Sequence, residues 1–161
     1  GLHTVSLQEE VAHVENYFEM QELKYPGCVF YYIDIDPEVK EWRIPQMIIH
    51  TIIENEYKYA VNINQMLTIL IKAEKRIIGG EQMLYIEIED DGEGYPDEVL
   101  EAIENKENTI TQTGERVGLK SVKRMMELMY ERDGLFTISN IEPHGCKNTF
   151  LIPEHAVQEM K

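Results

Sequence analysis

Apolar residues recur at intervals of three and four along three long stretches of the chain, and this spacing predicts amphipathic helices. A capping box opens the first helix, since Ser6 and Glu9 have the required spacing. Pro45 stands in the first turn of the second helix, where its missing N–H does no harm, and Gly134 ends the third. With a short acidic helix added, the predicted helices cover residues 7–25, 44–62, 96–103 and 118–132.

Runs rich in β-branched and aromatic residues lie between these helices and predict strands. Gly79-Gly80 and Pro143-His144-Gly145 connect neighbouring runs as hairpin turns. Because hairpins interleave with helices, we expect an α/β (α+β) two-layer sandwich whose mixed sheet is covered on one face by helices, rather than an all-parallel doubly wound sheet. The predicted strands cover residues 28–34, 67–77, 82–90, 135–141 and 148–152.

The composition is that of a soluble globular domain, with 161 residues of which 43% are hydrophobic and 28% charged. The net charge of -15 repels nucleic acid and anionic lipid, so a phosphate ligand needs a local positive pocket. Cys28 and Cys146 form no CxxC element and are too far apart in sequence to indicate a disulfide scaffold or a zinc site, so a reducing compartment is expected. No apolar run reaches the roughly 20 residues that span a bilayer, and we expect any membrane anchor outside this chain.

The second predicted helix has two different faces. On a helical wheel of about 100° per residue, a polar arc holds Glu54, Asn55 and Lys58. One interpretation of such an arc is an ordinary solvated face. The other is a site in which Asn55 supplies an oxygen ligand to Mg²⁺, Glu54 orients the attacking group and Lys58 binds the negative charge of phosphate. The apolar arc holds Ile48, Ile49, Ile52, Ile53, Ala60 and Ile63.

Two glycine-containing segments follow. A carboxylate at a strand end, Asp90, can accept a hydrogen bond from an exocyclic amine such as adenine N6, and Gly92 and Gly94 allow close backbone approach. An acidic turn is the alternative, and the spacing does not fit an EF-hand.

The second segment, residues 104–117, is polar and lacks periodicity, which predicts a mobile loop. The loop runs through Gly114 and Arg116 into Gly118, Leu119 and Lys120 at a helix start, where free N–H groups and basic side chains favour phosphate. An ordinary linker is the alternative, and no Walker A spacing occurs.

These three segments follow one another in the order of the N, G1 and G2 boxes of the GHKL ATPase superfamily, which the chain resembles. The likeness runs from about residue 5 to residue 153 and is strongest to sensor histidine kinases of the LytS/YesM type. The matching residues are Leu7, Glu10 and Tyr17, Ile44-Pro45, Gly118-Leu119-Lys120-Ser121-Val122, and Leu128-Met129-Tyr130.

The resemblance implies a Bergerat-type ATP-binding fold in which ATP lies beneath a flexible lid. It also implies that Asn55 binds Mg²⁺ and that Asp90 recognises the adenine base. It implies that residues 1–25 join an upstream dimerisation segment and that residues 26–161 form the catalytic domain. The γ-phosphoryl group would go to a histidine outside this chain and then to a response regulator. The parent protein would be a homodimer in the bacterial inner membrane, with this domain in the cytoplasm. The expected catalytic residues are Glu54 and Lys58, and the expected ATP-binding residues are Asn55, Lys58, Asp90, Gly92, Gly94, Gly114, Arg116, Gly118, Leu119 and Lys120.

Four positions depart from the family pattern. Glu56 replaces a small residue, Tyr59 a histidine, Arg116 a glycine and Cys146 a threonine. A carboxylate at position 56 falls in the apolar arc, so that part of the helix is exposed or Glu56 has a partner elsewhere. These departures leave open a catalytically weak module that binds nucleotide or a partner. A gyrase- or MutL-type clamp is disfavoured, since it requires further transducer domains.

No Asn-Pro-His-Phe motif, the usual phosphoacceptor context of the family, occurs in the sequence, so no phosphoacceptor is assigned. His50, one turn before Glu54, either lines the site or is a structural histidine.

Overall fold

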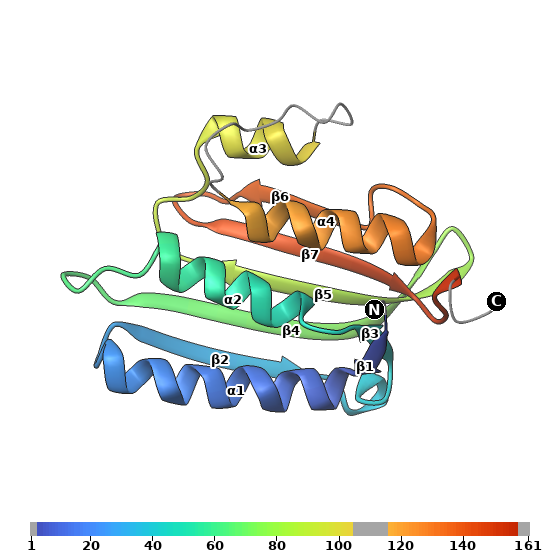
Figure 1. Ribbon diagram of the computed structural model, residues 1–161, viewed down its shortest axis with the longest axis horizontal. Coiled ribbons are helices and arrows are strands. Elements are labelled where there is room, and N and C mark those ends of the chain that lie inside the picture. The colour runs from blue at the N-terminus through green and yellow to red at the C-terminus, as the bar shows by residue number, and fades with distance from the viewer. Residues whose placement is uncertain (1–2, 105–115, 158–161) are drawn as a thin grey trace.

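The computed structural model describes residues 3–104 and 116–157, and in it one face of a mixed sheet carries the long helices (Figure 1). The strands of the main sheet lie in the order β2-β4-β5-β7-β6, with β2 parallel to β4 and the other pairs antiparallel. Those strands are β2 (Val29–Ile35), β4 (Leu67–Ile78), β5 (Glu81–Asp90), β6 (Phe136–Asn140) and β7 (Cys146–Pro153). The helices are α1 (Leu7–Lys24), the 3-10 turn η1 (Pro37–Val39), α2 (Ile48–Tyr59), α3 (Asp97–Glu104) and α4 (Val117–Tyr130). The predicted two-layer architecture is thereby confirmed.

The core lies between the sheet and the apolar faces of α1, α2 and α4. Phe18 of α1 stacks on Tyr31 of β2 with ring centres 4.0 Å apart, and Ile52 of α2 and Ile86 of β5 are fully buried. Each such side chain contributes about 1.5–3 kcal/mol through burial. The core therefore fixes the helices over the sheet and sets where their polar residues lie.

The start of α2 differs from the prediction, because Pro45 is not helical. Arg43–Pro45 forms a short strand, β3, which pairs antiparallel with β1 (Thr4–Ser6). The helix begins only at Ile48, after Met47 with a positive φ of 73°. It also ends at Tyr59 rather than at residue 62, so Ile63, placed in the apolar arc by the wheel, is 79% exposed.

A carboxylate from another helix explains this start. Glu10 of α1 is 2% exposed and accepts hydrogen bonds from the backbone N–H groups of Met47 (3.0 Å), Ile49 (3.0 Å) and His50 (3.2 Å). The first N–H groups of a helix lack partners within it, and a negative charge there is stabilising. Glu10 therefore acts as a tertiary cap that sets the beginning of α2.

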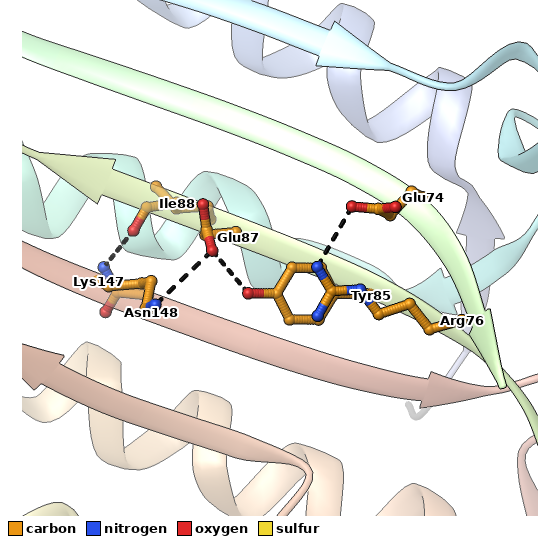
Figure 2. Close-up of polar contacts among 7 residues, drawn as sticks. All are labelled: Glu74, Arg76, Tyr85, Glu87, Ile88, Lys147 and Asn148. Carbon is orange, nitrogen blue, oxygen red and sulfur yellow. Dashed lines mark hydrogen bonds and ion pairs between the residues drawn. The ribbon is translucent and has the colours of Figure 1, made fainter. Parts of the chain in front are cut away.

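The opposite face of the sheet, which the long helices leave uncovered, carries polar pairs between neighbouring strands (Figure 2). The Arg76 guanidinium lies 3.5 Å from the ring centre of Tyr85, whose hydroxyl donates to Glu87 at 2.6 Å. Lys147 of β7 pairs with the same Glu87 at 3.8 Å. These contacts hold β5 between β4 and β7, and β5 ends at Asp90.

Candidate functional site

A cavity of about 630 Å³ opens between α2, the segment after β5 and the start of α4. A second one of about 380 Å³ lies beside it, and Asn55 and Arg116 line both. The first contains the predicted residues Asn55, Asp90, Gly92, Gly94 and Arg116, and the second contains Glu54, Asn55, Lys58, Arg116 and Gly118. The fold therefore brings together most residues that the sequence singled out.

The residues of the polar arc of α2 differ in their exposure to solvent. Asn55 is 7% exposed, whereas Glu54 and Lys58 are exposed. The Oε1 atom of Glu54 lies 3.3 Å from Nε2 of His50 one turn earlier. Burial lowers the pKa of His50, so its ring is neutral at pH 7 and the contact is not an ion pair between two full charges. His50 is thus a buried residue that orients Glu54.

The Asp90 carboxylate is held on two sides. Its Oδ1 accepts the backbone N–H of Gly92 at 2.9 Å, and the thiol of Cys146 donates to its Oδ2 at 3.1 Å. Gly145, with φ of 118°, passes so close that a Cβ atom there would clash with the carbonyl oxygen of Asp90. The carboxylate is therefore fixed in direction before any ligand arrives.

The segment after Asp90 is held by two asparagine side chains, of which Asn148 is fully buried and Asn140 is exposed. Tyr95 donates from its backbone N–H to Asn140 at 2.7 Å and from its hydroxyl to Asn148 at 2.5 Å. Asn148 in turn donates to the carbonyl of Ile88 at 3.2 Å, one of the contacts in Figure 2. A Cβ atom at Gly94 would come within 2.8 Å of the Asn140 side chain, so packing requires a glycine there, whereas the sequence suggested it for close approach to a ligand.

Glu56 is buried at 2% exposure, which excludes local exposure of the helix as the explanation for it. Its partner is Asp90: burial first, and the hydrogen bond with the Asp90 carboxyl second, raise the pKa of Glu56 well above its usual range. Glu56 therefore keeps its proton to a higher pH than an ordinary glutamate does. The two residues are 34 positions apart, and the only signal in the sequence was the unusual residue at position 56.

Tyr59 and Arg116 meet where the two cavities adjoin. The Arg116 guanidinium lies 3.8 Å from the ring centre of Tyr59, and the Arg116 backbone N–H donates to the Tyr59 hydroxyl at 3.1 Å. The Lys58 ammonium lies 5.3 Å from the centre of that ring. The tyrosine therefore holds two cations at the cavity mouth by cation–π attraction. The sequence marked Tyr59 as a departure from the family without finding this role.

The remaining predicted residues lie around the start of α4. A Cβ at Gly118 would approach Thr51 to 3.0 Å, so this glycine lets α4 pack closely on α2. Leu119 is fully buried and packs in the core, and the backbone N–H of Lys120 donates to the carbonyl of Arg116 at 3.3 Å. Gly114 and most of the predicted mobile loop fall at residues 105–115, outside the described residues.

The chain matches the family described as histidine kinase-, DNA gyrase B-, and HSP90-like ATPases over residues 43–156. It is 24% identical over 153 residues to the sensor protein LytS of Enterococcus faecalis, covering 93% of this chain and 25% of that protein. It is 28% identical over 151 residues to the sensor histidine kinase YesM of Bacillus subtilis, covering 92% of this chain and 24% of the relative. The chain thus spans about a quarter of the length of these curated relatives.

The fold is that of solved histidine kinase domains. The catalytic domain of histidine kinase ThkA superposes with a TM-score of 0.69 at 18% identity, covering 96% of this chain and 98% of that one. Within residues 3–104 and 116–157, no helix has both the length and the apolar character to cross a membrane.

Proposed function

Since the chain belongs to the family of histidine kinase-, DNA gyrase B- and HSP90-like ATPases, we propose that it is the ATP-binding catalytic domain of a sensor histidine kinase. Its reaction transfers the γ-phosphoryl group of ATP to a histidine on a dimerisation helix outside this chain. A response regulator then takes the phosphoryl group. In support, the relative ThkA has been solved in complex with the response regulator protein TrrA.

The observation that carries the proposal is that Asn55 and Asp90 line one cavity. Asp90, fixed by Gly92 and Cys146, accepts a hydrogen bond from the adenine amino group. The carboxamide oxygen of Asn55, at the junction of the two cavities, suits the hard oxygen ligation of Mg²⁺ and would hold that ion. The bound ion would supply charge neutralisation at the phosphates.

The chain's own residues supply the rest of the site. Glu54, oriented by His50, faces the second cavity and would polarise the attacking imidazole. Lys58 and Arg116, both held on Tyr59, bring positive charge to a protein whose net charge is -15. Phosphoryl transfer needs positioning and charge neutralisation above all, and these groups provide both.

The parent protein extends the proposal beyond this chain. We propose that α1 joins an upstream dimerisation segment and that the full-length protein is a homodimer. It would be attached to the bacterial inner membrane through that upstream part, with the present domain in the cytoplasm. The short coverage of LytS and YesM by this chain supports a longer parent.

Calorimetric titration with ADP tests nucleotide binding directly. Asp90→Ala should weaken ADP binding about 100-fold with or without Mg²⁺, because the loss of a buried polar contact removes roughly 2–3 kcal/mol. Asn55→Ala should weaken it chiefly when Mg²⁺ is present. Asp34→Ala on the exposed part of β2 is the matched control and should bind as the original chain does. Unchanged affinity in both site variants would remove the proposal.

A second candidate, a regulatory module that binds nucleotide or a partner without turnover, is favoured by one observation. Arg116 and Glu56, both departures from the family pattern, lie in the cavity that the purine would enter. Incubation of the full-length parent with γ-labelled ATP separates the candidates. A kinase labels its own histidine, and a module that only binds leaves the parent unlabelled.

A further inference from the structure

Three buried side chains converge at the inner end of the first cavity, and we call them the inner cluster: Glu56, Asp90 and Cys146. One ligand atom of each lies within 4.8 Å of those of the other two. Their exposures are 2%, 5% and 3%. Three rigid elements supply them, since Glu56 is on α2 while Asp90 and Cys146 are directly paired across β5 and β7. All three also line the cavity and so remain reachable from it.

One atom of the inner cluster lacks a partner. Among the residues that the structure describes, the Oε2 atom of Glu56 is buried and has no hydrogen-bond partner. Buried polar groups are normally satisfied, so an exception of this kind requires an explanation. The hydroxyl of Tyr95, another residue of the cavity wall, is engaged with Asn148 instead. The unpaired oxygen is therefore available to a ligand.

We propose that the inner cluster binds Zn²⁺, with Glu56, Asp90 and Cys146 as its three protein ligands and the cavity side left open for a solvent molecule. One sulfur and two carboxylate oxygens are donors that a borderline-soft divalent ion accepts, whereas Mg²⁺ and Ca²⁺ take oxygen alone. The sequence did not indicate this metal site. Its one cysteine ligand, Cys146, follows Glu56 by 90 residues, and the sequence contains no CxxC spacing.

The geometry requires little rearrangement. In tetrahedral zinc sites, Zn–S is about 2.3 Å and Zn–O about 2.0–2.2 Å, so neighbouring ligand atoms lie roughly 3.3–3.7 Å apart. The Cys146 sulfur and the Asp90 Oδ2 atom are 3.1 Å apart, and no pair in the inner cluster exceeds 4.8 Å. The observed separations are thus close to those that a tetrahedral site requires. The ion also favours the thiolate form, which burial otherwise disfavours at Cys146.

Occupation of this site has a consequence for the proposed nucleotide function. Asp90 is the carboxylate expected to accept from the adenine amine, and its Oδ2 atom cannot bind a metal and meet a purine at the same time. Zinc and nucleoside therefore exclude each other at the inner cluster. This part of the inference rests on the proposed function, whereas metal binding itself does not.

Cobalt titration of the 161-residue chain tests the site without any nucleotide. Co²⁺ reports on cysteine ligation through a sulfur-to-metal charge-transfer band in the near ultraviolet, and Zn²⁺ should remove the band by displacing Co²⁺. Cys146→Ser should abolish it. Cys28→Ser, which changes the other buried cysteine and leaves the cavity lining intact, should retain it. Glu56→Gln should keep the band but weaken Co²⁺ binding at least about tenfold.

The outcomes are decisive in both directions. No band in the original chain, or an equal band in Cys146→Ser, overturns the proposal. If Cys146→Ser does not fold, as judged by circular dichroism, Glu56→Gln carries the test, and an unchanged Co²⁺ affinity in that variant overturns it.

Adenosine, which carries no phosphate to chelate metal, tests the exclusion. Zn²⁺ should weaken adenosine binding to the original chain at least about tenfold and leave binding to Cys146→Ser unchanged. If adenosine fails to bind even without metal, the proposed nucleotide function fails while the cobalt result stands. If adenosine binds and Co²⁺ does not, the zinc site alone fails.

Discussion

The inner cluster and the outer polar face of α2 lie on the same helix and differ in almost every physical respect. The outer face, Glu54 and Lys58, is exposed and keeps the residues that its family pattern expects. In the inner cluster, Glu56 is 2% exposed and both Glu56 and Cys146 depart from that pattern. Because successive helical residues turn by about 100°, Asn55 borders both regions. The comparison indicates that α2 keeps the family pattern on its outer face and departs from it in the inner cluster.

The largest expected effect concerns the close packing of Gly145 against Asp90 in the inner cluster. Gly145→Ala should lower the free energy of unfolding by about 3 kcal/mol or more, or prevent folding, because the added Cβ meets the carbonyl of Asp90 and φ is positive. Urea unfolding measures the loss. Gly79→Ala, at a turn with positive φ but open space around it, should cost only about 1 kcal/mol. Equal losses in the two variants would mean that the contact of Gly145 with Asp90 adds no steric constraint.

Glu10→Ala should have the next largest effect. It leaves three N–H groups at the start of α2 without their buried acceptor, and a loss of about 2 kcal/mol is expected in urea unfolding. Glu19→Ala removes an exposed acidic residue from the middle of the same helix and should change stability by less than about 0.5 kcal/mol. A negligible loss in Glu10→Ala would show that α2 begins at Ile48 for another reason.

The carboxyl pair predicts a pH dependence that the outer face does not share. The pKa of Glu56 is raised in the folded protein, so the folded state binds more protons than the unfolded state between the usual glutamate pKa and the raised one. Stability from this group is therefore fully present below the usual value and declines as pH rises through that window, with a slope of at most about 1.4 kcal/mol per pH unit.

Glu56→Gln should remove that decline, since its side chain does not titrate. Thermal unfolding at a series of pH values measures the slope. Glu93→Gln, at an exposed position in the same cavity wall, is the control and should keep the slope of the original chain. A decline of the same steepness in Glu56→Gln would place its origin outside the carboxyl pair.

The smallest effect is expected at the cavity mouth. Tyr59→Phe keeps the aromatic ring on which Arg116 lies and removes only the hydroxyl that accepts the backbone N–H of Arg116. The free energy of unfolding should therefore fall by about 0.5–1 kcal/mol. Tyr59→Leu removes the ring as well and should lose about 0.5–1 kcal/mol more. Tyr32→Phe on exposed β2 should have no measurable effect. Thermal unfolding distinguishes the three, and equal stability of the Phe and Leu variants would remove the cation–π interpretation.

The sequence was sufficient wherever a local rule decides the structure. Ser6 accepts the backbone N–H of Glu9 at 3.1 Å, as the capping box required, and the Gly79-Gly80 turn joins β4 and β5 as predicted. The sequence also singled out Asn55 and Asp90, which line one cavity, and their binding roles stay predictions. The roles assigned to Glu54, Lys58 and the G2 segment stay predictions.

Contacts between residues that are far apart in the sequence could not be predicted. Pro45 fits a first helical turn by every local rule, yet strand pairing with β1 and the carboxylate of Glu10 move the start of α2 to Ile48. The partner of Glu56 could not be found either, since Asp90 comes from a strand on the far side of a hairpin. Neither contact leaves a periodic trace in the sequence, because each depends on packing of the whole sheet.

The bonds from Glu10 to the first turn of α2 couple two helices mechanically. Three amide hydrogens of the Met47–His50 segment are attached to one side chain of α1, so α2 cannot stay in place if α1 slides or turns. Asn55 lies less than two turns further along α2. We therefore expect a movement of α1 to shift Asn55 as well, through the Glu10 carboxylate and the first turns of α2.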